Sequence, residues 1–192
     1  QVTEFSENVI PYSKLLEAAA VAGASLVVYG SSGGQVYGNV AKLPIIESAP
    51  LKPVSAYGKA KVEMEKLTRD LTARRGIPHL IVRPGNPYGP EQERTNRHGA
   101  VPALIRAALS GQSFTAYGAG ETVRDYIFIT DAAAQIGKLI LAGVQNQTVN
   151  IGSGQGASLT ELIALIEKIV GKKIAVKPEP IRPSDVRENV LD

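Results

Sequence analysis

Cysteine is absent from the 192 residues of the sequence, which excludes disulfide bonds and metal sites built on thiolates. Histidine is also scarce, and because His79 and His98 lie far apart the sequence predicts no histidine metal cluster. No apolar run approaches the roughly 18 residues that are needed to span a membrane, and no charged and then apolar leader opens the chain. We therefore expect a cytoplasmic protein with no metal and no membrane segment.

Charge of one sign is not in excess, because 21 lysines and arginines against 18 acidic residues give a net charge of only +3. The basic pairs Arg74-Arg75 and Lys172-Lys173 fall near predicted helix ends, where cations complement the helix dipole. This pattern favours solvated helix ends over a nucleic-acid surface. The chain begins at Gln1 rather than at methionine, so we interpret it as processed or as part of a longer protein.

Helical and strand patterns alternate along the chain. Apolar spacing, caps and stop residues predict helices over residues 9–22, 56–75, 101–109, 131–142 and 158–170. Short apolar runs predict strands over residues 25–29, 79–83, 123–129, 148–151 and 174–176, with a turn over 84–87. Strands separated by helices of this length imply βαβ units in a parallel α/β sheet, within one domain or a domain with a small lobe.

Tyr57 and Lys61 lie four residues apart in the segment YGKAK, at the start of the predicted helix over 56–75. This spacing places both side chains on one face of the helix. A phenol is a poor base at neutral pH, but a neighbouring ammonium favours the phenolate and lowers the pKa of the phenol. A tyrosine tuned in this way takes a proton from a substrate hydroxyl and returns it. On spacing alone, an ordinary surface pair that packs its methylene groups explains the pattern better.

The position of the pair favours the chemical interpretation. It follows a long irregular stretch, and the predicted strand over 25–29 ends in the Gly/Ser-rich loop 30–38. In parallel sheets, ligands bind beyond the carboxyl ends of the strands. Serine hydroxyls in the loop are candidates to bond a substrate oxygen, although a plain turn of small residues accounts for the same composition.

A second glycine-rich segment, residues 152–157, fits the dinucleotide pattern G-x-G-x-x-[G/A] after a predicted strand. The helix that follows does not open at the third small residue, because Ser158 and Glu161 form a capping box that begins it later. The acidic residue expected about 20 positions on is also unconvincing, since Glu179 is late and flanked by prolines. We interpret this segment as a false match.

Taken together, the motifs resemble the extended short-chain dehydrogenase/reductase family, the NAD-dependent sugar-nucleotide epimerases and dehydratases, and most of all its UDP-glucose 4-epimerase-like members. The resemblance is carried, in order, by SSGGQVYG (31–38), YGKAK (57–61), RPGNPYGP (83–90), VRDYIFITDAA (123–133), NIGSG (150–154) and RPSDV (182–186). It covers essentially the whole chain, but only the later two-thirds of the family's length. It implies a Rossmann-like parallel sheet, of which the chain holds the C-terminal part, with a small α/β substrate-binding lobe.

The resemblance also implies roles for individual residues. Tyr57 and Lys61 look like the catalytic Y-x-x-x-K pair, with Ser32 as a candidate third catalytic residue, and Lys61 also holds the nicotinamide ribose. Contacts to the cofactor NAD are expected from Asn8, Ser31, Tyr57, Lys61 and Pro84. Contacts to a nucleotide-sugar substrate, with UDP as the expected carrier, are implied for Asn86 and Arg124 and Arg182 at the phosphates and for Tyr117 at the base.

The sequence departs from the family pattern in its first motif. The family's catalytic serine or threonine sits four residues before the tyrosine of V-Y-G, where this sequence has Gly33. Ser32 is adjacent and is the candidate to supply that hydroxyl. The family's dehydratases place an Asp-Glu pair after the serine position, where this sequence has Gly34 and Gln35, so the resemblance favours an epimerase over a dehydratase.

The second departure concerns the cofactor. The family's glycine-rich dinucleotide loop lies upstream of the region that begins at Gln1, and glycine amides of that kind do much of the pyrophosphate binding. We therefore expect this chain to bind NAD weakly or not at all, and we expect an open edge on its sheet. Two hypotheses follow: a parent enzyme that epimerises a nucleotide sugar through a transient keto-sugar, or a non-catalytic module that retains part of a nucleotide-sugar pocket. A family dehydratase or reductase remains a further alternative.

The resemblance divides the chain into two parts. Residues 1–86, rejoined by 123–147, are expected to form the cofactor and catalytic domain, and residues 87–122 with 148–192 the substrate-binding lobe. A homodimer that packs the helices over 9–22 and 56–75 is also expected.

Overall fold

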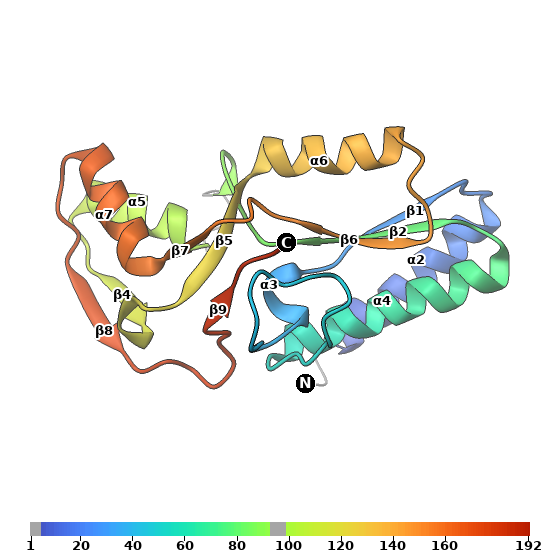
Figure 1. Ribbon diagram of the computed structural model, residues 1–192, viewed down its shortest axis with the longest axis horizontal. Helices are drawn as coiled ribbons and strands as arrows, with labels where there is room; N and C mark the ends of the chain where they lie inside the picture. Colours follow the sequence, from blue (N-terminus) through green and yellow to red (C-terminus); the bar gives the residue numbers. More distant parts are fainter. Residues whose placement is uncertain (1–4, 93–98) are drawn as a thin grey trace.

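The computed structural model describes residues 5–92 and 99–192 of the chain. Figure 1 shows a parallel sheet with helices on both faces at one end of the molecule and a smaller lobe of short strands and helices at the other. This arrangement confirms the predicted α/β class, with a parallel sheet and an α/β lobe.

The parallel sheet contains three strands in the order β1, β2, β6. Strand β1 spans Val27–Gly30, β2 spans His79–Pro84 and β6 spans Gln147–Ile151. Both neighbouring pairs are parallel, with Val28 opposite Leu80 and Ile81 opposite Thr148. Within the described ranges β1 is an edge strand, which agrees with the expected open edge.

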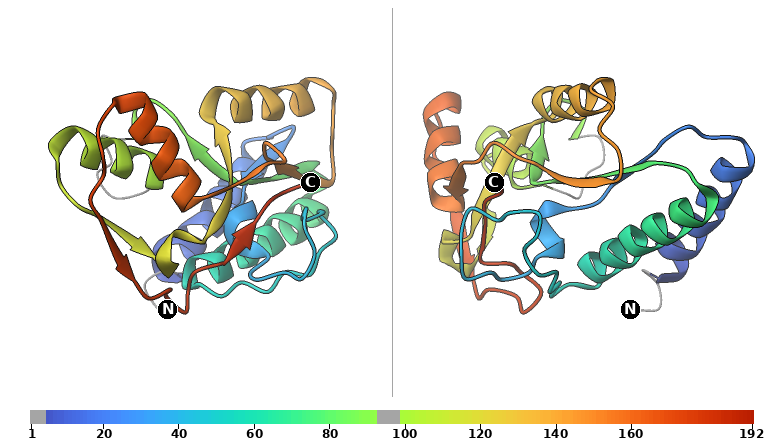
Figure 2. Two further views of the ribbon diagram at one scale, coloured as in Figure 1. Left: turned by 60° about the vertical axis from the view of Figure 1, so that its left-hand side comes forward. Right: turned by 45° about the vertical axis from the view of Figure 1, so that its right-hand side comes forward.

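Helices cover both faces of this sheet, and this explains why β2 is an almost continuous apolar run. Helices α2 (Ile10–Val21) and α4 (Ala56–Arg75) lie on one face and α6 (Ile129–Leu141) on the other, and both views of Figure 2 keep α4 and α6 on opposite sides. Alternate residues of β2 enter the two cores. Ile81 packs with residues of α4, whereas Leu80 and Val82 pack toward α6.

Helix α4 has the predicted bounds because both of its ends are capped. The Ser55 hydroxyl accepts a hydrogen bond from the Gly58 amide, and Gly76 takes the left-handed conformation after the last turn, with φ of 65°. In helix α2, Pro11 lies in the first turn as expected. A five-residue π-helical turn, η1 (Phe5–Val9), precedes this helix and was not predicted.

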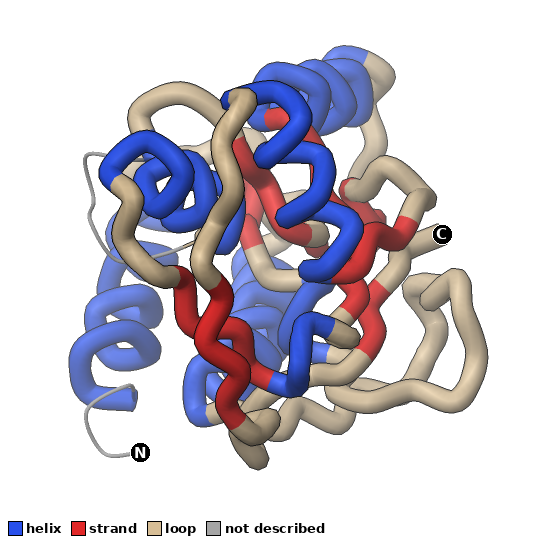
Figure 3. The backbone as a smooth tube through the Cα atoms, turned by 90° about the vertical axis from the view of Figure 1, so that its left-hand side faces the viewer, coloured by secondary structure: helices blue, strands red, loops and turns tan. Residues whose placement is uncertain are grey.

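The lobe is built from helices α5 (Ala100–Ser110) and α7 (Leu159–Val170) over two small sheets. Strand β5 (Val123–Phe128) is central to the first, which also contains β3 (Asn86–Tyr88), β7 (Gly156–Ser158) and β9 (Glu188–Asn189). Strands β4 (Phe114–Tyr117) and β8 (Val176–Glu179) form the second, and Figure 3 shows this pair below the lobe helices. The short helices are α3 (Gly33–Val36) and η3 (Gly118–Gly120).

Several strands differ from their prediction. The predicted turn over 84–87 is instead the end of β2 followed by β3. The predicted strand over 174–176 starts only at Val176, because the Ile174 amide donates to the Glu167 side chain and not to a neighbouring strand. Strands β4, β7 and β9 were not predicted. They are short, and they exist because distant segments pair with them, which local patterns do not report.

The predicted division of the chain differs from the strand pairing at two places. Residues 148–151 belong to β6 and pair with β2 in the main sheet rather than with the lobe. Residues 123–128 form β5, which pairs with β3, β7 and β9 of the lobe rather than with the main sheet. The register of hydrogen bonds decides both placements. The division into two functional parts remains a prediction.

A buried ion pair joins helix α4 to strand β2. Glu65 is fully buried and Arg83 is 3% exposed. The guanidinium grips both carboxylate oxygens, with Nε 2.8 Å from Oε1 and Nη2 2.7 Å from Oε2. Burial alone raises the pKa of Glu65, but the hydrogen bonds from Arg83, Ser31 and Arg69 and the charge of Arg83 outweigh it and hold that pKa below its usual value.

Replacing Glu65 by glutamine should lower the free energy of unfolding by about 3–5 kcal/mol, because the buried charge of Arg83 would lose its partner. Because the folded-state pKa of Glu65 is lowered, its contribution is present above the unfolded pKa of about 4.3 and is lost as pH falls through the folded value. Urea denaturation as a function of pH should therefore show a constant difference between wild type and Glu65→Gln near neutral pH, shrinking below about pH 4.

Glu17→Gln is the matched control. Glu17 pairs with Arg75 at 2.8 Å, but both side chains are about half exposed, so its loss should cost no more than about 1 kcal/mol. Equal losses for the two glutamine variants would contradict the importance assigned to the buried pair.

Candidate active site

Tyr57 and Lys61 face each other on the first two turns of α4, beside the carboxyl end of β1. The Lys61 Nζ atom is 5.6 Å from the centre of the Tyr57 ring and donates a hydrogen bond of 2.9 Å to the carbonyl of Gly30. Tyr57 is 45% exposed and so is accessible to a ligand. Partial burial lowers the pKa of Lys61. The structure thus brings the predicted pair together at the carboxyl ends of the strands, where parallel sheets bind ligands.

The residue after Gly30 is held by the same helix. The Ser31 hydroxyl is buried and donates a hydrogen bond of 2.6 Å to Glu65, one turn beyond Lys61 on α4. Consecutive residues at the end of β1 are therefore clamped to α4 at two points. The Ser31 hydroxyl is turned to Glu65 in this structure, and its predicted contact to a cofactor stays a prediction.

The glycine-serine loop packs directly against the first turn of α4. The Ser55 hydroxyl donates to the side chain of Gln35 at 2.8 Å, and a Cβ atom on Gly58 would lie only 2.8 Å from the Gln35 carbonyl. Glycine at position 58 therefore permits helix α3 and helix α4 to approach closely. This contact places the Ser31–Tyr37 segment beside Tyr57.

The structure gives a reason for the glycine at the family's serine position. A Cβ atom on Gly33 would lie 2.6 Å from the Leu191 side chain and 2.7 Å from the Arg83 carbonyl, so a serine does not fit there without movement of the backbone. Ser32 begins α3, is partly exposed and makes no capping hydrogen bond with its side chain. The catalytic role predicted for Ser32 is compatible with this placement and remains a prediction.

One pocket of about 160 Å³ in the lobe brings together all four predicted substrate residues, namely Asn86, Tyr117, Arg124 and Arg182. They come from strands β3, β4 and β5 and from the loop after β8, so no local pattern connects them. The Oδ1 atom of Asn86 is buried and has no hydrogen-bond partner among the described residues. A residue that lines a pocket and has an unsatisfied polar atom is a candidate to meet a ligand.

The two arginines of this pocket are held differently. Arg182 stacks on Tyr117, with its guanidinium carbon 4.2 Å from the ring centre, and pairs with Asp185 at 3.0 Å. The hydrogen bond with Asp185 raises the pKa of Arg182. Arg124 donates to the carbonyls of Val123, Val186 and Arg187, and burial lowers its pKa. Arg124 therefore also fixes the C-terminal segment, which the sequence did not predict.

Sequence reasoning missed other residues of this pocket. Tyr126, Thr115 and Asp185 also line it. Alternation along β5 offered a signal for Tyr126, because it lies two residues from Arg124 and therefore on the same face of the strand. Thr115 had no comparable signal, since β4 was not predicted.

The two remaining predicted cofactor residues lie on different elements. Asn8 is exposed within η1, just before α2, and Pro84 is the last residue of β2. Pro84 is thus at the same carboxyl end of the sheet as Gly30, which pairs with Val82 of β2. The role of both in binding a cofactor remains a prediction.

The second glycine-rich segment is occupied by the protein itself. The buried carboxylate of Asp125 accepts hydrogen bonds from the amides of Ser153 at 2.7 Å and Gly154 at 3.2 Å, and from the Ser153 hydroxyl at 2.6 Å. The following helix begins at Leu159 behind the predicted capping box. Amides that already bind a carboxylate are not available for a pyrophosphate, which supports the interpretation of a false match.

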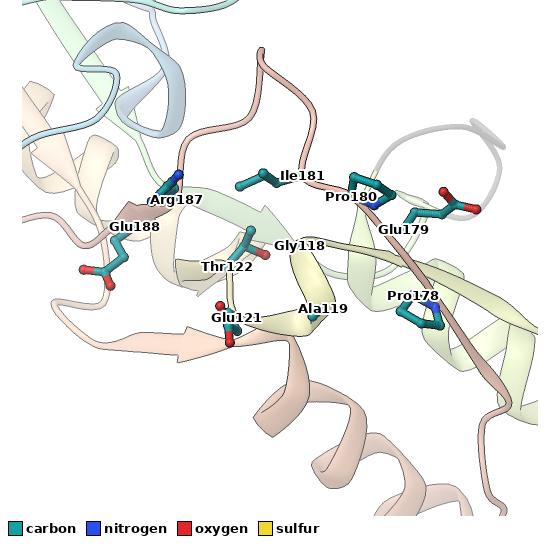
Figure 4. A pocket seen from close by; sticks show the side chains of 10 residues that line it. All are labelled: Gly118, Ala119, Glu121, Thr122, Pro178, Glu179, Pro180, Ile181, Arg187 and Glu188. Carbon is teal, nitrogen blue, oxygen red and sulfur yellow. The ribbon is translucent and has the colours of Figure 1, made fainter.

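A larger hollow of about 650 Å³ lies on the lobe beyond η3. Figure 4 shows its lining, which comes from residues 118–122 and from the segment 178–188. Thr122 lines this hollow and also the smaller pocket, so the two adjoin at that residue. None of the predicted site residues lines the larger hollow.

Two exclusions concern the described residues alone. No group of three or more His, Asp or Glu side chains suited to a metal ion occurs among them, and His98 lies outside the described residues. In the same ranges, no helix combines the length and the apolar character that crossing a bilayer requires.

Comparison with known proteins identifies the family of the chain. Residues 2–152 match the model of the NAD dependent epimerase/dehydratase family. The chain belongs to this family, whose members are enzymes that act with NAD.

Relatives and solved structures are similar over nearly all of the chain. A putative UDP-glucose 4-epimerase of Methanocaldococcus jannaschii is 32% identical over 96% of this chain and 60% of its own length. The UDP-glucose 4-epimerase of Thermus thermophilus, solved with NAD, has a TM-score of 0.87 at 30% identity and covers 98% of this chain and 62% of its own. The Thermotoga maritima enzyme, solved with UDP-glucose, has a TM-score of 0.87 at 31% identity, over 96% and 60%. The chain thus spans about three-fifths of the length of these proteins.

Replacing Gly33 by serine should lower the free energy of unfolding by about 1–3 kcal/mol, because the new side chain would press on Leu191 and on the Arg83 carbonyl. Thermal and urea denaturation measure the effect. Gly30→Ala is the control, since a Cβ atom there meets nothing within 4 Å, and its effect should stay within about 0.5 kcal/mol. A neutral Gly33→Ser variant would reopen position 33 as the site of the catalytic hydroxyl.

Proposed function

We propose that this chain carries the nucleotide-sugar pocket and the proton-transfer residues of an NAD-dependent epimerase that acts on a UDP-sugar. One observation carries the proposal: four residues from separate elements, predicted to contact the substrate, line one pocket. The proposal also draws on the relatives and solved structures that are named UDP-glucose 4-epimerases. Because the chain spans only part of their length, activity and substrate are proposed here for the protein as a whole.

Helix α3 contacts both a residue of the substrate pocket and the start of the helix that carries the proton-transfer pair. The Asn86 side chain lies against Gly34, since its Oδ1 atom is 3.2 Å from the place of a Cβ on that glycine. The next residue, Gln35, bonds Ser55 at the start of α4. A diphosphate held by Asn86 and the arginines would therefore direct the attached sugar past α3, toward Tyr57.

The substrate residues suit a nucleoside diphosphate. Guanidinium groups form paired, charge-assisted hydrogen bonds to phosphate oxygens, and Arg182 is 57% exposed and so accessible to them. Tyr117 is 37% exposed, and the face of its ring that Arg182 does not cover is proposed to stack on the base. The Asn86 amide would contact the diphosphate between them.

Tyr57 is proposed to take the proton from the sugar hydroxyl that is oxidised and to return it after the sugar has turned over. The Lys61 ammonium, held at the Gly30 carbonyl, stabilises the phenolate form by its charge. Ser32, at the start of α3, is proposed to supply the hydroxyl that bonds the same sugar oxygen. It would replace the family's serine or threonine, whose position Gly33 occupies here. NAD, when bound, supplies the acceptor and then the donor of a hydride.

Part of NAD is proposed to bind at the carboxyl ends of β1 and β2. Lys61, Tyr57 and Pro84 would hold the nicotinamide ribose there, and Asn8 and Ser31 are proposed as further contacts to the cofactor. The glycine-rich segment 152–157 does not fit the pyrophosphate, because Asp125 already occupies its amides. This is the observation behind the alternative function, a module that binds a nucleotide sugar without catalysis. A dehydratase is less well supported, because Gly34 and Gln35 stand where an acid–base pair would be required.

The substrate assignment is tested by calorimetric titration of the chain with UDP. We expect the wild-type chain to bind UDP and Arg182→Met to bind it about 10- to 100-fold more weakly, because the variant loses one charge-assisted hydrogen bond to phosphate. Arg187→Met is the control, since Arg187 is an exposed arginine of the same segment that lines the other hollow. Absence of UDP binding by the wild-type chain, or equal effects of the two variants, would refute the assignment.

The catalytic assignment is tested by turnover of UDP-glucose with NAD supplied, in the protein as a whole and not in the isolated chain, which is expected to bind NAD weakly or not at all. We expect interconversion of the sugar, a fall of at least about 100-fold in Tyr57→Phe, and an unchanged thermal midpoint. Lys61→Met should also lose activity, whereas Lys59→Met, exposed on the same helix, should keep it. Retained activity in Tyr57→Phe would overturn the role of Tyr57, and UDP binding without any turnover would favour the non-catalytic alternative.

A further inference from the structure

The ammonium of Lys61 lies between two aromatic rings. Its Nζ atom is 5.3 Å from the centre of the Tyr29 ring and 5.6 Å from the centre of the Tyr57 ring. Both distances are within the range of roughly 6 Å over which an aromatic face attracts a cation. The hydrogen bond to Gly30 places the ammonium at the residue directly after Tyr29.

The two rings differ in how firmly they are held. Tyr57 is 45% exposed on the first turn of its helix, whereas Tyr29 is only 6% exposed in the middle of β1. Tyr29 packs in one cluster with Met64 and Ile81, and its ring centre is 4.9 Å from that of Tyr12. The Tyr29 ring is therefore packed on several sides by the protein itself.

The hydroxyl of Tyr29 does not explain its place in this core. The atom is buried and has no hydrogen-bond partner in the described part of the chain. Burial raises the pKa of Tyr29, so the ring is neutral and its face is available to a cation. The face of the ring, and not its hydroxyl, is what meets Lys61.

We propose that Tyr29 is a positioning residue that holds the Lys61 ammonium against the Gly30 carbonyl, and so keeps it within reach of Tyr57. The proposal rests on the proposed proton-transfer role of the Tyr57–Lys61 pair, and it adds a residue that none of the six matched motifs contains. The long, flexible lysine side chain would otherwise be free to leave the partly buried site for water. The Tyr29 face and the Gly30 carbonyl compensate the ammonium for the hydration that it loses.

The test follows the Lys61 side chain by NMR titration of the ligand-free chain with labelled lysine, with Lys61→Met identifying the signal. Tyr29→Met keeps an apolar side chain of comparable size but removes the ring. We expect the Lys61 midpoint to fall by about 0.5–1 pH unit, because the charged form loses an attractive ring face. Tyr29→Phe keeps the face and should leave the midpoint unchanged.

A merely structural role of Tyr29 predicts the opposite sign. A loosened core would admit water to Lys61, and its pKa would then rise toward the usual value, because burial is what lowers it. A rise or no change in Tyr29→Met, or an equal fall in Tyr29→Phe, would overturn the proposal. If Tyr29→Met does not fold, a ring-fluorinated phenylalanine at position 29 keeps the shape and weakens the negative face, and the same fall is expected.

This measurement uses no UDP and no NAD, so its outcome is separate from that of the proposed function. A chain that fails to bind UDP but shows the expected fall would keep the positioning role and lose the substrate. A chain that binds UDP but shows no fall would keep the substrate and lose the positioning role.

Discussion

The buried pair of Glu65 and Arg83 is the interaction on which the candidate site depends. The carboxylate also accepts from the Ser31 hydroxyl, and the guanidinium also donates to the Tyr37 hydroxyl at 2.8 Å. Both ends of the Ser31–Tyr37 segment are therefore tied to one ion pair. Because an unpaired charge at such a depth is costly, the pair disfavours arrangements that would separate α4, β2 and this segment. Tyr57 and Lys61 share that helix, so the ion pair also sets where they stand relative to Ser32.

The network extends from this pair to the rest of the fold. The Tyr37 hydroxyl donates to Asn150 at the end of β6, and the Asn150 side chain donates to the carbonyl of Ile45. Ile45 pairs with Leu191 in the C-terminal segment, and Leu191 packs on Gly33. The ends of β1, β2 and β6 and the C-terminal segment are therefore held by connected polar and packing contacts. A ligand at this edge would meet a surface that is already organised without it.

Predictions from the sequence were confirmed where interactions between residues close in the sequence decide the structure. The bounds of α4 follow from a serine cap and a left-handed glycine, and the pairing of Tyr57 with Lys61 follows from helical spacing. The predictions failed where pairing is distant. Strand β4 exists because β8 pairs with it about 60 residues later in the chain. The start of β3 was taken for a turn because residues 84–87 include two prolines and a glycine, and the strand forms only by pairing with β5.

The sequence by itself determined the α/β class and the helical spacing of the tyrosine–lysine pair, and through resemblance it predicted a set of substrate residues. Only the tertiary structure decided that Asn86, Tyr117, Arg124 and Arg182 line one pocket, that Asp125 fills the amides of the second glycine-rich segment, and that Tyr29 lies against Lys61. The physical reason is the same in each case. Spacing within one element follows from helix and strand geometry, whereas these contacts join elements whose approach is set by packing and by the buried charges between them.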